Sequence, residues 1–114
     1  MQRYIVLYRA PLSVAQRFAQ ATPAEAAEGM KLWTAWHDRI GDNLIDPGGP
    51  LGNARRVGPT AVAPTNTDII GMSILQADSI DAALTMVSNH HHLHWAPNCE
   101  ILLLEEQPIP ELQQ

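Results

Sequence analysis

The chain has 114 residues, of which 46% are hydrophobic and 17% charged, and its formal net charge is −5 at pH 7. This length suits one domain and leaves no room for a second hydrophobic core. An acidic protein repels phosphate backbones and anionic lipid surfaces, which excludes nucleic acid as a partner. No apolar run approaches the roughly 20 residues of a membrane span, and nothing at the N-terminus resembles a signal peptide. We therefore expect a cytoplasmic protein that binds neither nucleic acid nor membrane.

The first expected elements are a strand and a long helix. Residues 4–8 are β-branched and aromatic, and both of their alternating sets are largely apolar, which predicts a buried strand. Residues 11–20 have apolar side chains at helical spacing and are compatible with a short helix. Thr22 and Glu25 fit a capping box, and the helix that they start is expected to end at Gly41.

The rest of the chain predicts three more strands, a hairpin and a second helix. The segment 47–68 is rich in Gly and Pro, and because so long a loop is uncommon in a compact domain, we expect a small hairpin within it. The expected elements are, in chain order, a strand at 44–46, hairpin strands at 54–57 and 60–63 around Gly58-Pro59, a strand at 69–75, a helix capped by Asp78 or Ser79, and a strand at 101–104.

The order strand, helix, strand, strand, helix, strand predicts an α+β domain with a ferredoxin-like β-α-β-β-α-β sheet and both helices on one face. The domain is expected to span residues 1–107, with a C-terminal tail at 108–114. The other face of the sheet would be apolar and bare, which costs about 25 cal/mol per Å². A second copy of the chain is therefore expected to cover it, giving a homodimer. The residues expected in the core are Ile5, Leu7, Ile74, Leu84, Leu102 and at least one of Trp33 and Trp36.

Several stretches resemble the YCII-related family, which includes the DGPF-domain group, and together they cover nearly the whole chain. They are 3–8 (RYIVLY), 33–41 (WTAWHDRIG), 44–51 (LIDPGGPL), 71–74 (GMSI), 77–84 (ADSIDAAL) and His92-Leu93. The resemblance implies a dimeric α/β barrel with a small pocket between the sheet and the first helix. Some members of the family act on small molecules through a histidine and an aspartate. The positions of that pair fall near Leu32 and Ala10 in this chain, so the resemblance does not transfer the pair.

Four of the five histidines lie in the segment 90–95. In an extended segment His90, His92 and His94 would share one side and form a weak candidate metal site, because neutral imidazoles bind zinc, copper or nickel. The alternatives are a solvated helix exit and a single pocket histidine, for which the resemblance favours His92. No cofactor is expected, since a histidine-rich tract alone is only a compositional signal.

His37 and His92 are the candidate catalytic residues. His37 is expected on the apolar stripe of the first helix, where burial would lower its pKa and keep it neutral as a base. The alternative for His37 is a structural histidine in the core. Asp38 points about 100° away around the helix and is a poor partner for His37.

The candidate ligand-binding residues are Tyr8, Arg9, Trp36 and Trp95. Arg9 ends the first strand, where it can hold a carboxylate or else form an ion pair with Glu105 or Glu106. The tryptophans can line a pocket or belong to the core. Cys99, the single cysteine, is expected as a small buried hydrophobic residue.

These features leave two main hypotheses of function. The first is a small-molecule-binding or scaffold domain at the pocket of the dimeric barrel, with a small anion as ligand. The second is a cofactor-free hydrolase, isomerase or lyase of small organic acids or lactones that acts through a pocket histidine. A haem- or metal-dependent oxygen enzyme is a third hypothesis. Convergence of His37, His92 and Arg9 on one pocket would favour an enzyme.

Overall fold

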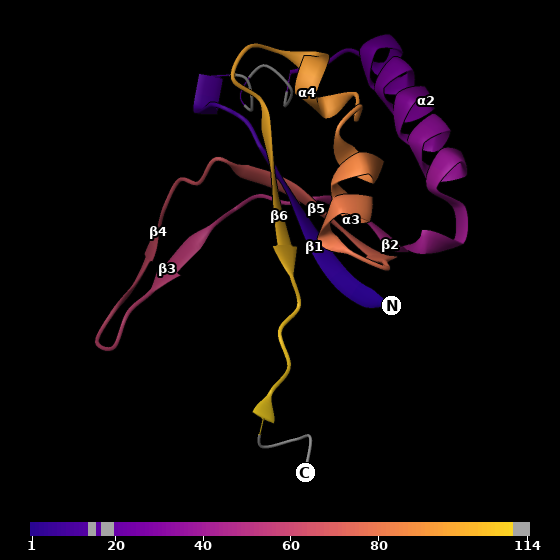
Figure 1. Ribbon diagram of the computed structural model, residues 1–114. Helices are drawn as coiled ribbons and strands as arrows, with labels where there is room; N and C mark the ends of the chain where they lie inside the picture. The colour runs from indigo at the N-terminus through magenta and orange to yellow at the C-terminus, as the bar shows by residue number, and fades with distance from the viewer. Residues whose placement is uncertain (14–15, 17–19, 111–114) are drawn as a thin grey trace.

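The computed structural model describes residues 1–13, 16 and 20–110 (Figure 1). Its elements are β1 (Gln2–Arg9), α2 (Pro23–Ile40), a 3-10 turn (Gly41–Asn43), β2 (Leu44–Pro50), β3 (Arg55–Val57), β4 (Val62–Pro64), β5 (Ile69–Ala77), α3 (Ile80–Val87), α4 (His92–Trp95) and β6 (Glu100–Glu105). A short helix is expected at 11–20. Leu12, Ser13 and Gln16 are helical, and positions 14–15 and 17–19 lie outside the described residues. Within the described ranges, no helix combines the length and apolar character that a membrane crossing requires.

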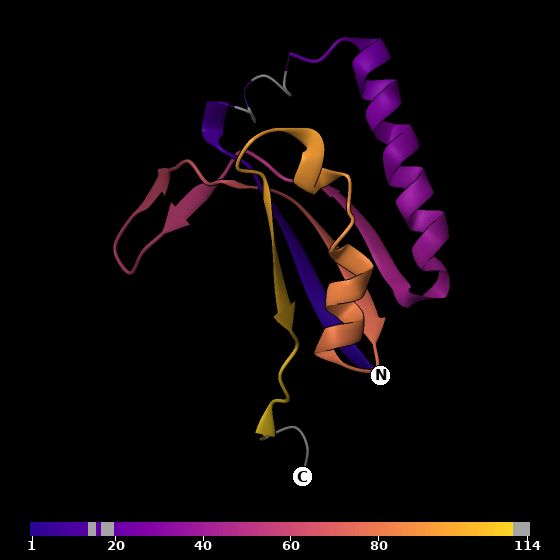
Figure 2. The same ribbon diagram turned by 45° about the horizontal axis from the view of Figure 1, so that its top comes forward.

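The main sheet has four strands in the order β2-β5-β1-β6, and all neighbouring pairs are antiparallel. Helices α2 and α3 both lie on one side of this sheet (Figures 1 and 2). This arrangement confirms the predicted α+β class and is compatible with a ferredoxin-like fold. It also places the carboxyl end of β1 beside the start of β5, where Arg9 pairs with Ile69 after an irregularity in the register.

Local signals fix the ends of both main helices. The Thr22 side chain accepts a hydrogen bond from the Glu25 amide, and the Glu25 carboxylate accepts one from the Thr22 amide, both at 3.2 Å. Gly41 follows α2 with φ of 63°, a conformation that glycine adopts at little cost. Ser79 caps α3 by accepting a hydrogen bond from the Ala82 amide at 3.1 Å. These caps confirm the predicted start and end of α2 and the predicted start of α3.

The hydrophobic core lies between the sheet and the two helices. Its fully buried large side chains include Tyr4, Val6 and Tyr8 of β1 and Leu75 of β5, and Trp36 of α2 packs on them. The side chains at alternate positions therefore point to the other side of the sheet, which no element covers within the described part of the chain. The apolar residues of this open face are Ile5, Leu7, Met72, Ile74, Leu102 and Leu104.

Part of the predicted core is wrong. Ile5, Leu7 and Ile74 are only half-buried, and Leu102 is 40% exposed, because all four lie on the open face. Both alternating sets of β1 are apolar, so the alternation alone does not tell which set faces the helices. Leu84 is 47% exposed, because Ala83 and Val87 form the buried side of α3 and the next residue lies about 100° around the helix.

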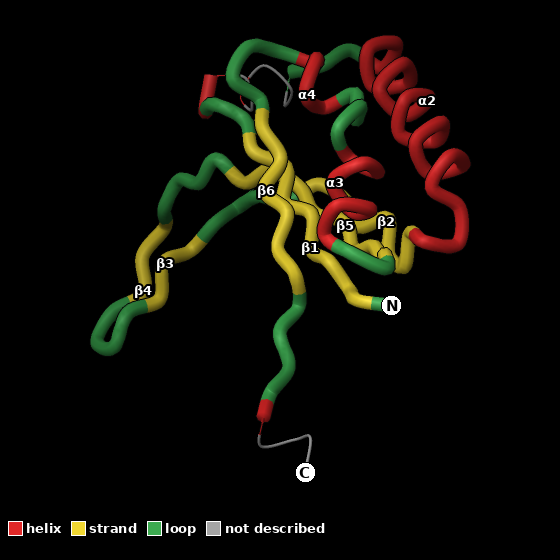
Figure 3. The backbone as a smooth tube through the Cα atoms, in the orientation of Figure 1, coloured by secondary structure: helices red, strands yellow, loops and turns green. Residues whose placement is uncertain are grey.

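The predicted hairpin in the segment 47–68 is present. Strands β3 and β4 pair with each other in a separate two-stranded sheet, and the Gly58 amide donates a hydrogen bond to the Ala61 carbonyl at 2.8 Å across the turn. The hairpin extends away from the main sheet (Figure 3). The radius of gyration is accordingly 16.0 Å, against about 13 Å for a compact domain of this length.

A pair of leucine truncations tests this assignment of the core. Leu75→Ala should lower the free energy of unfolding by about 2–5 kcal/mol, because Leu75 is fully buried in a central strand. Leu84→Ala should cost less than about 1.5 kcal/mol, because half of its side chain is already in water. Urea unfolding followed by circular dichroism measures both values. Equal losses for the two variants would show that α3 is rotated relative to the sheet.

Candidate functional site

A cluster of aromatic and imidazole rings lies between α2 and the carboxyl end of β1. Tyr8 contacts Trp33 and His90 with ring centroids 4.9 and 5.0 Å apart, and Trp36 contacts His90 at 4.5 Å. His90 in turn stacks on His91 at 4.4 Å. We call this group the ring cluster; its members are Tyr8, Trp33, Trp36, His90, His91 and His92.

The ring cluster is assembled from three parts of the chain. Trp33 and Trp36 lie three residues apart on α2, so both project from the same side of that helix. The Trp36 indole N–H donates to the Met86 carbonyl at 3.0 Å, which joins α2 to the last turn of α3. The chain then turns back toward the sheet, where the His90 amide donates to the Val87 carbonyl. The contact between α2 and the segment after α3 brings His90 onto Tyr8, and a hydrogen bond to the Arg9 carbonyl holds His92 there.

His90 is the most buried histidine, and half of its hydrogen-bonding capacity is unused. Its Nδ1 accepts a hydrogen bond from the His92 amide at 3.1 Å, so a neutral His90 carries its proton on Nε2. Nε2 is buried and has no partner among the described residues, and the same holds for Nδ1 of His91. A buried polar atom without a hydrogen bond costs about 1–3 kcal/mol and calls for an explanation.

Burial also keeps His90 neutral. Loss of solvation lowers its pKa to about 3, and positive charge on His91 or His92, when these are protonated, and on Arg39 acts in the same direction. Burial lowers the pKa of His91 as well, followed by the charges of His92 and Arg39. The ring cluster is therefore an uncharged, poorly hydrated group of rings at neutral pH.

The Tyr8 hydroxyl belongs to a short chain of hydrogen bonds. The Ser73 hydroxyl donates to the Pro47 carbonyl at 2.8 Å, so the Tyr8 hydroxyl, also 2.8 Å away, must donate to Ser73. Burial raises the pKa of Tyr8, and the hydrogen bond with Ser73 only partly offsets it. Tyr8 therefore stays protonated and is already paired.

The turn that presents the Pro47 carbonyl depends on Gly48. Its φ is 68°, and a Cβ at this position would lie 1.8 Å from the Met72 carbonyl oxygen, so no side chain fits. The Asp46 carboxylate accepts a hydrogen bond from the Gly48 amide at 2.8 Å and holds the turn. The register between β2 and β5 is irregular on both sides of Asp46.

His92, a predicted catalytic residue, lies at the end of β1 as expected. Its Nε2 is 2.8 Å from the Arg9 carbonyl, and since a carbonyl only accepts, Nε2 carries the proton. Burial lowers the pKa of His92, while the carbonyls of Arg9 and Glu100 oppose this shift. His92 therefore joins the end of β1 to the start of β6. Trp95 lies beside it, with ring centroids 6.1 Å apart.

Arg9 pairs with Asp68, a partner that the sequence did not indicate. Its Nε and Nη2 donate to Asp68 Oδ2 at 2.9 and 2.6 Å. The hydrogen bond and the opposite charge raise the pKa of Arg9 and lower that of Asp68. The two side chains are 39% and 45% exposed, so solvent screens the pair and its contribution to stability is small. The predicted ion pair of Arg9 with Glu105 or Glu106 is wrong, because Arg3 at the other end of β1 pairs with Glu106.

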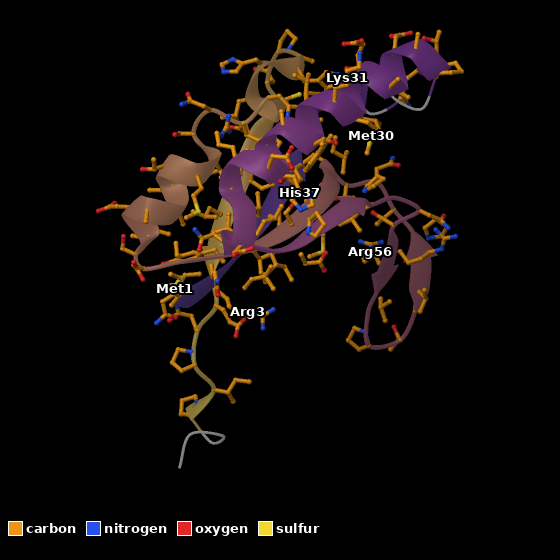
Figure 4. All side chains as sticks on the ribbon, turned by 90° about the vertical axis from the view of Figure 1, so that its right-hand side faces the viewer. Met1, Arg3, Met30, Lys31, His37 and Arg56 are labelled. Carbon is orange, nitrogen blue, oxygen red and sulfur yellow. The ribbon has the colours of Figure 1, made fainter. Side chains whose placement is uncertain are left out.

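His37 is exposed on α2 (Figure 4). Its predicted place on the apolar stripe is wrong, because the inward side of α2 consists of Trp33, Trp36 and Ile40. His37 follows Trp36 and so points about 100° away from it. The structure therefore does not bring His37 to the ring cluster.

The candidate metal ligands are also separated. His90 and His92 are buried, but His94 is exposed on α4. Within the part of the chain that the structure describes, no three His, Cys, Asp or Glu side chains are grouped so that they could hold a metal ion. Cys99 is buried beside Ala10, as expected for a small hydrophobic residue.

A groove of about 310 Å³ lies where α2 and α3 end. It combines the charge of Arg39 with polar and apolar side chains, and its lining residues are Arg39, Ile40, Thr85, Met86 and Asn89. The sequence did not indicate this groove, because no local sequence signal relates the end of α2 to the end of α3. Met86 connects the groove to the ring cluster, because its carbonyl accepts the hydrogen bond of the Trp36 indole, and the positive charge of Arg39 acts on His90 and His91.

No family model matches the chain, and no match was found among curated proteins or solved structures. The resemblance to the YCII-related family therefore stays a prediction. The candidate site rests on its own geometry at the carboxyl end of β1: His92 contacts the Tyr8 ring, Trp95 and the Arg9 carbonyl, and the Arg9 side chain pairs with Asp68.

The buried histidines make stability depend on pH. His90 has a folded-state pKa near 3, so between about pH 6.5 and 5 the unfolded chain binds its proton and the folded chain does not. Stability should therefore fall on acidification, by up to about 1.4 kcal/mol per pH unit for this one histidine.

Urea unfolding at pH 7, 6 and 5 measures this slope. His90→Gln should reduce it, with the remainder coming from His91 and His92, whose pKa values are also lowered. His37→Gln, which removes an exposed histidine from the same chain, is the control. An unchanged slope in His90→Gln would contradict the assignment of His90 as a buried neutral histidine.

Proposed function

We propose that this protein is a homodimeric small-molecule-binding domain of the YCII-related type, and that it holds a small organic acid at the carboxyl end of β1. The observation that carries the proposal is the half-exposed Arg9 guanidinium, which Asp68 holds in position at a residue whose backbone carbonyl contacts His92. Arg9 offers a planar set of donors suited to a carboxylate. Two of these donors bond to Asp68 in the structure, and a bound carboxylate would displace Asp68.

The neighbouring side chains support a ligand of mixed character. Trp95 is partly exposed beside His92 and provides an apolar wall. Ligand pockets usually combine such an apolar lining with a few polar groups that fix orientation. The anion would meet Arg9 and its apolar part would meet Trp95.

Binding without turnover is favoured over acid–base catalysis. The His92 ring faces the carbonyls of Arg9 and Glu100, which commits it to joining two strands. The Tyr8 hydroxyl is committed to Ser73, and His37 is exposed on another side of α2. A general base must lie within hydrogen-bond reach of the proton that it removes. These contacts do not support such a base, because His92 and Tyr8 are already bonded and His37 lies elsewhere.

The homodimer is supported by the open face of the sheet. Six apolar side chains from β1, β5 and β6 lie together there with no covering element in the described ranges. A large apolar patch on a small protein is typical of an interface. Two such faces related by a two-fold axis would cover each other and close the sheets into a barrel.

Titration with small acids tests the binding site. Acetate, succinate and benzoate, followed by NMR, should shift the signals of the Arg9 and Trp95 side chains together. Arg9→Ala should weaken binding about tenfold or more, since a hydrogen bond to a charged group is worth about 1.5–3 kcal/mol. Asp68→Asn should strengthen binding, because the competing carboxylate is gone. Arg3→Ala, at the other end of the same strand, is the matched control and should bind as the wild type does. Equal affinities in Arg9→Ala and Arg3→Ala would contradict the site.

A matched pair of leucine variants tests the dimer. Leu102 lies on the open face and Leu84 on the helical side, with 40% and 47% of each exposed. Leu102→Glu should convert a dimer to a monomer in light scattering at micromolar concentration, because it places a charge in the apolar interface. Leu84→Glu should leave the mass unchanged. A wild-type monomer under these conditions would rule out the homodimer.

A further inference from the structure

The hairpin of β3 and β4 is exposed on both sides. Val57 and Val62 pair across its two strands near the tip and are 74% and 65% exposed. Arg55 and Arg56 come from the same short strand, β3. An isolated two-stranded hairpin is only marginally stable in water, so this one needs a surface to pack on.

The base of the hairpin is firmly attached to the main sheet. The Leu51 amide donates to the Ile70 carbonyl at 2.9 Å, and the Ala10 amide donates to the Asp68 carbonyl at 2.8 Å. The hairpin then extends away from α2 and α3, past the other side of the sheet (Figures 1 and 2). It therefore projects on the side where the open face lies.

The charge of the hairpin segment is opposite to that of the rest of the chain. Residues 47–67 contain two of the seven basic residues and none of the twelve acidic ones. Arg55 bonds to Asn53 and the Ala54 carbonyl, and within the described residues neither Arg55 nor Arg56 meets a carboxylate. Figure 4 shows Arg56 on this hairpin. The rest of the chain is strongly acidic and would attract the positively charged hairpin.

The exposed area of the chain also exceeds that of a compact monomer. The accessible surface is 7989 Å², whereas a compact protein of 12.5 kDa exposes about 6,200 Å². The excess of roughly 1,800 Å² is greater than the approximately 800 Å² that each partner buries in a standard interface. A second copy that covers both the open face and the hairpin would account for it.

We infer that the β3–β4 hairpin is an arm that packs on the second copy of the chain in the homodimer. This inference rests on the proposed homodimer and adds a second contact to it. Val57 and Val62 would be covered by the other copy, and Arg55 and Arg56 would face its acidic surface. A hollow of about 220 Å³ along the hairpin, lined by Arg56, Gly58, Thr60, Ala61 and Ala63, would receive side chains of that copy. The contact is mutual, because a two-fold axis makes each copy both give and receive an arm.

Two measurements on the full chain test the arm. In a mixed dimer of isotope-labelled and unlabelled chains, the methyl groups of Val57 and Val62 should give nuclear Overhauser effects to the unlabelled copy. In analytical ultracentrifugation Arg56→Glu should weaken the dimer about tenfold or more, as expected for the loss of one close charge pair. Lys31→Glu makes the same charge change on α2, where Lys31 pairs with Glu28 of its own helix. This control should weaken the dimer much less.

The outcomes separate the arm from the dimer. Intermolecular signals from the valines together with a weaker Arg56→Glu dimer would support the arm. A dimer that Leu102→Glu breaks, but that shows no such signals and is unaffected by Arg56→Glu, would overturn the arm and leave the proposed function standing. A wild-type monomer would overturn both.

Discussion

The alternation of side chains along β1 is the constraint on which the rest of the structure depends. β1 lies between β5 and β6, and its inward side chains Tyr4, Val6 and Tyr8 are fully buried under the helices. Every inward position on a strand implies an outward neighbour. The apolar residues Ile5 and Leu7 are therefore forced onto the open face. The core and the proposed interface are two sides of the same strand, so neither can be changed in register without the other.

Much of the fold could be predicted because its signals are local. The cap at Thr22, the cap at Ser79 and the turn at Gly58-Pro59 each depend on a few neighbouring residues, and the strand order follows from simple rules of connection. The orientation of elements is less predictable, because it depends on partners that are distant in sequence. Both sets of side chains on β1 are apolar, and α3 presents Ala83 rather than the larger Leu84 to the sheet. The larger size of the Leu84 side chain therefore indicated the wrong side of α3.

Part of the geometry at the end of β1 follows from the sequence. His92 contacts the Tyr8 ring and the Arg9 carbonyl there, because the end of a strand can be predicted from local signals. Asp68 was missed, since its contact with Arg9 spans 59 residues and depends on the irregular pairing of Arg9 with Ile69. The sequence favours a solvated helix exit or a weak metal site for His90, whereas its burial results from Trp36 packing on it from another helix. His37 is likewise one residue away from the inward side of α2, since Trp36 is the residue that packs on His90.

The turn at Gly48 has a consequence for how this protein could vary. Only a residue without a Cβ lets the chain pass so close to the Met72 carbonyl, and this passage sets the Pro47 carbonyl against Ser73. Ser73 in turn fixes the Tyr8 hydroxyl. The orientation of a phenol in the middle of the domain is thus controlled from an exposed turn, through two intervening groups. Any side chain at residue 48 would therefore disturb the hydrogen bonds of Tyr8 through Pro47 and Ser73.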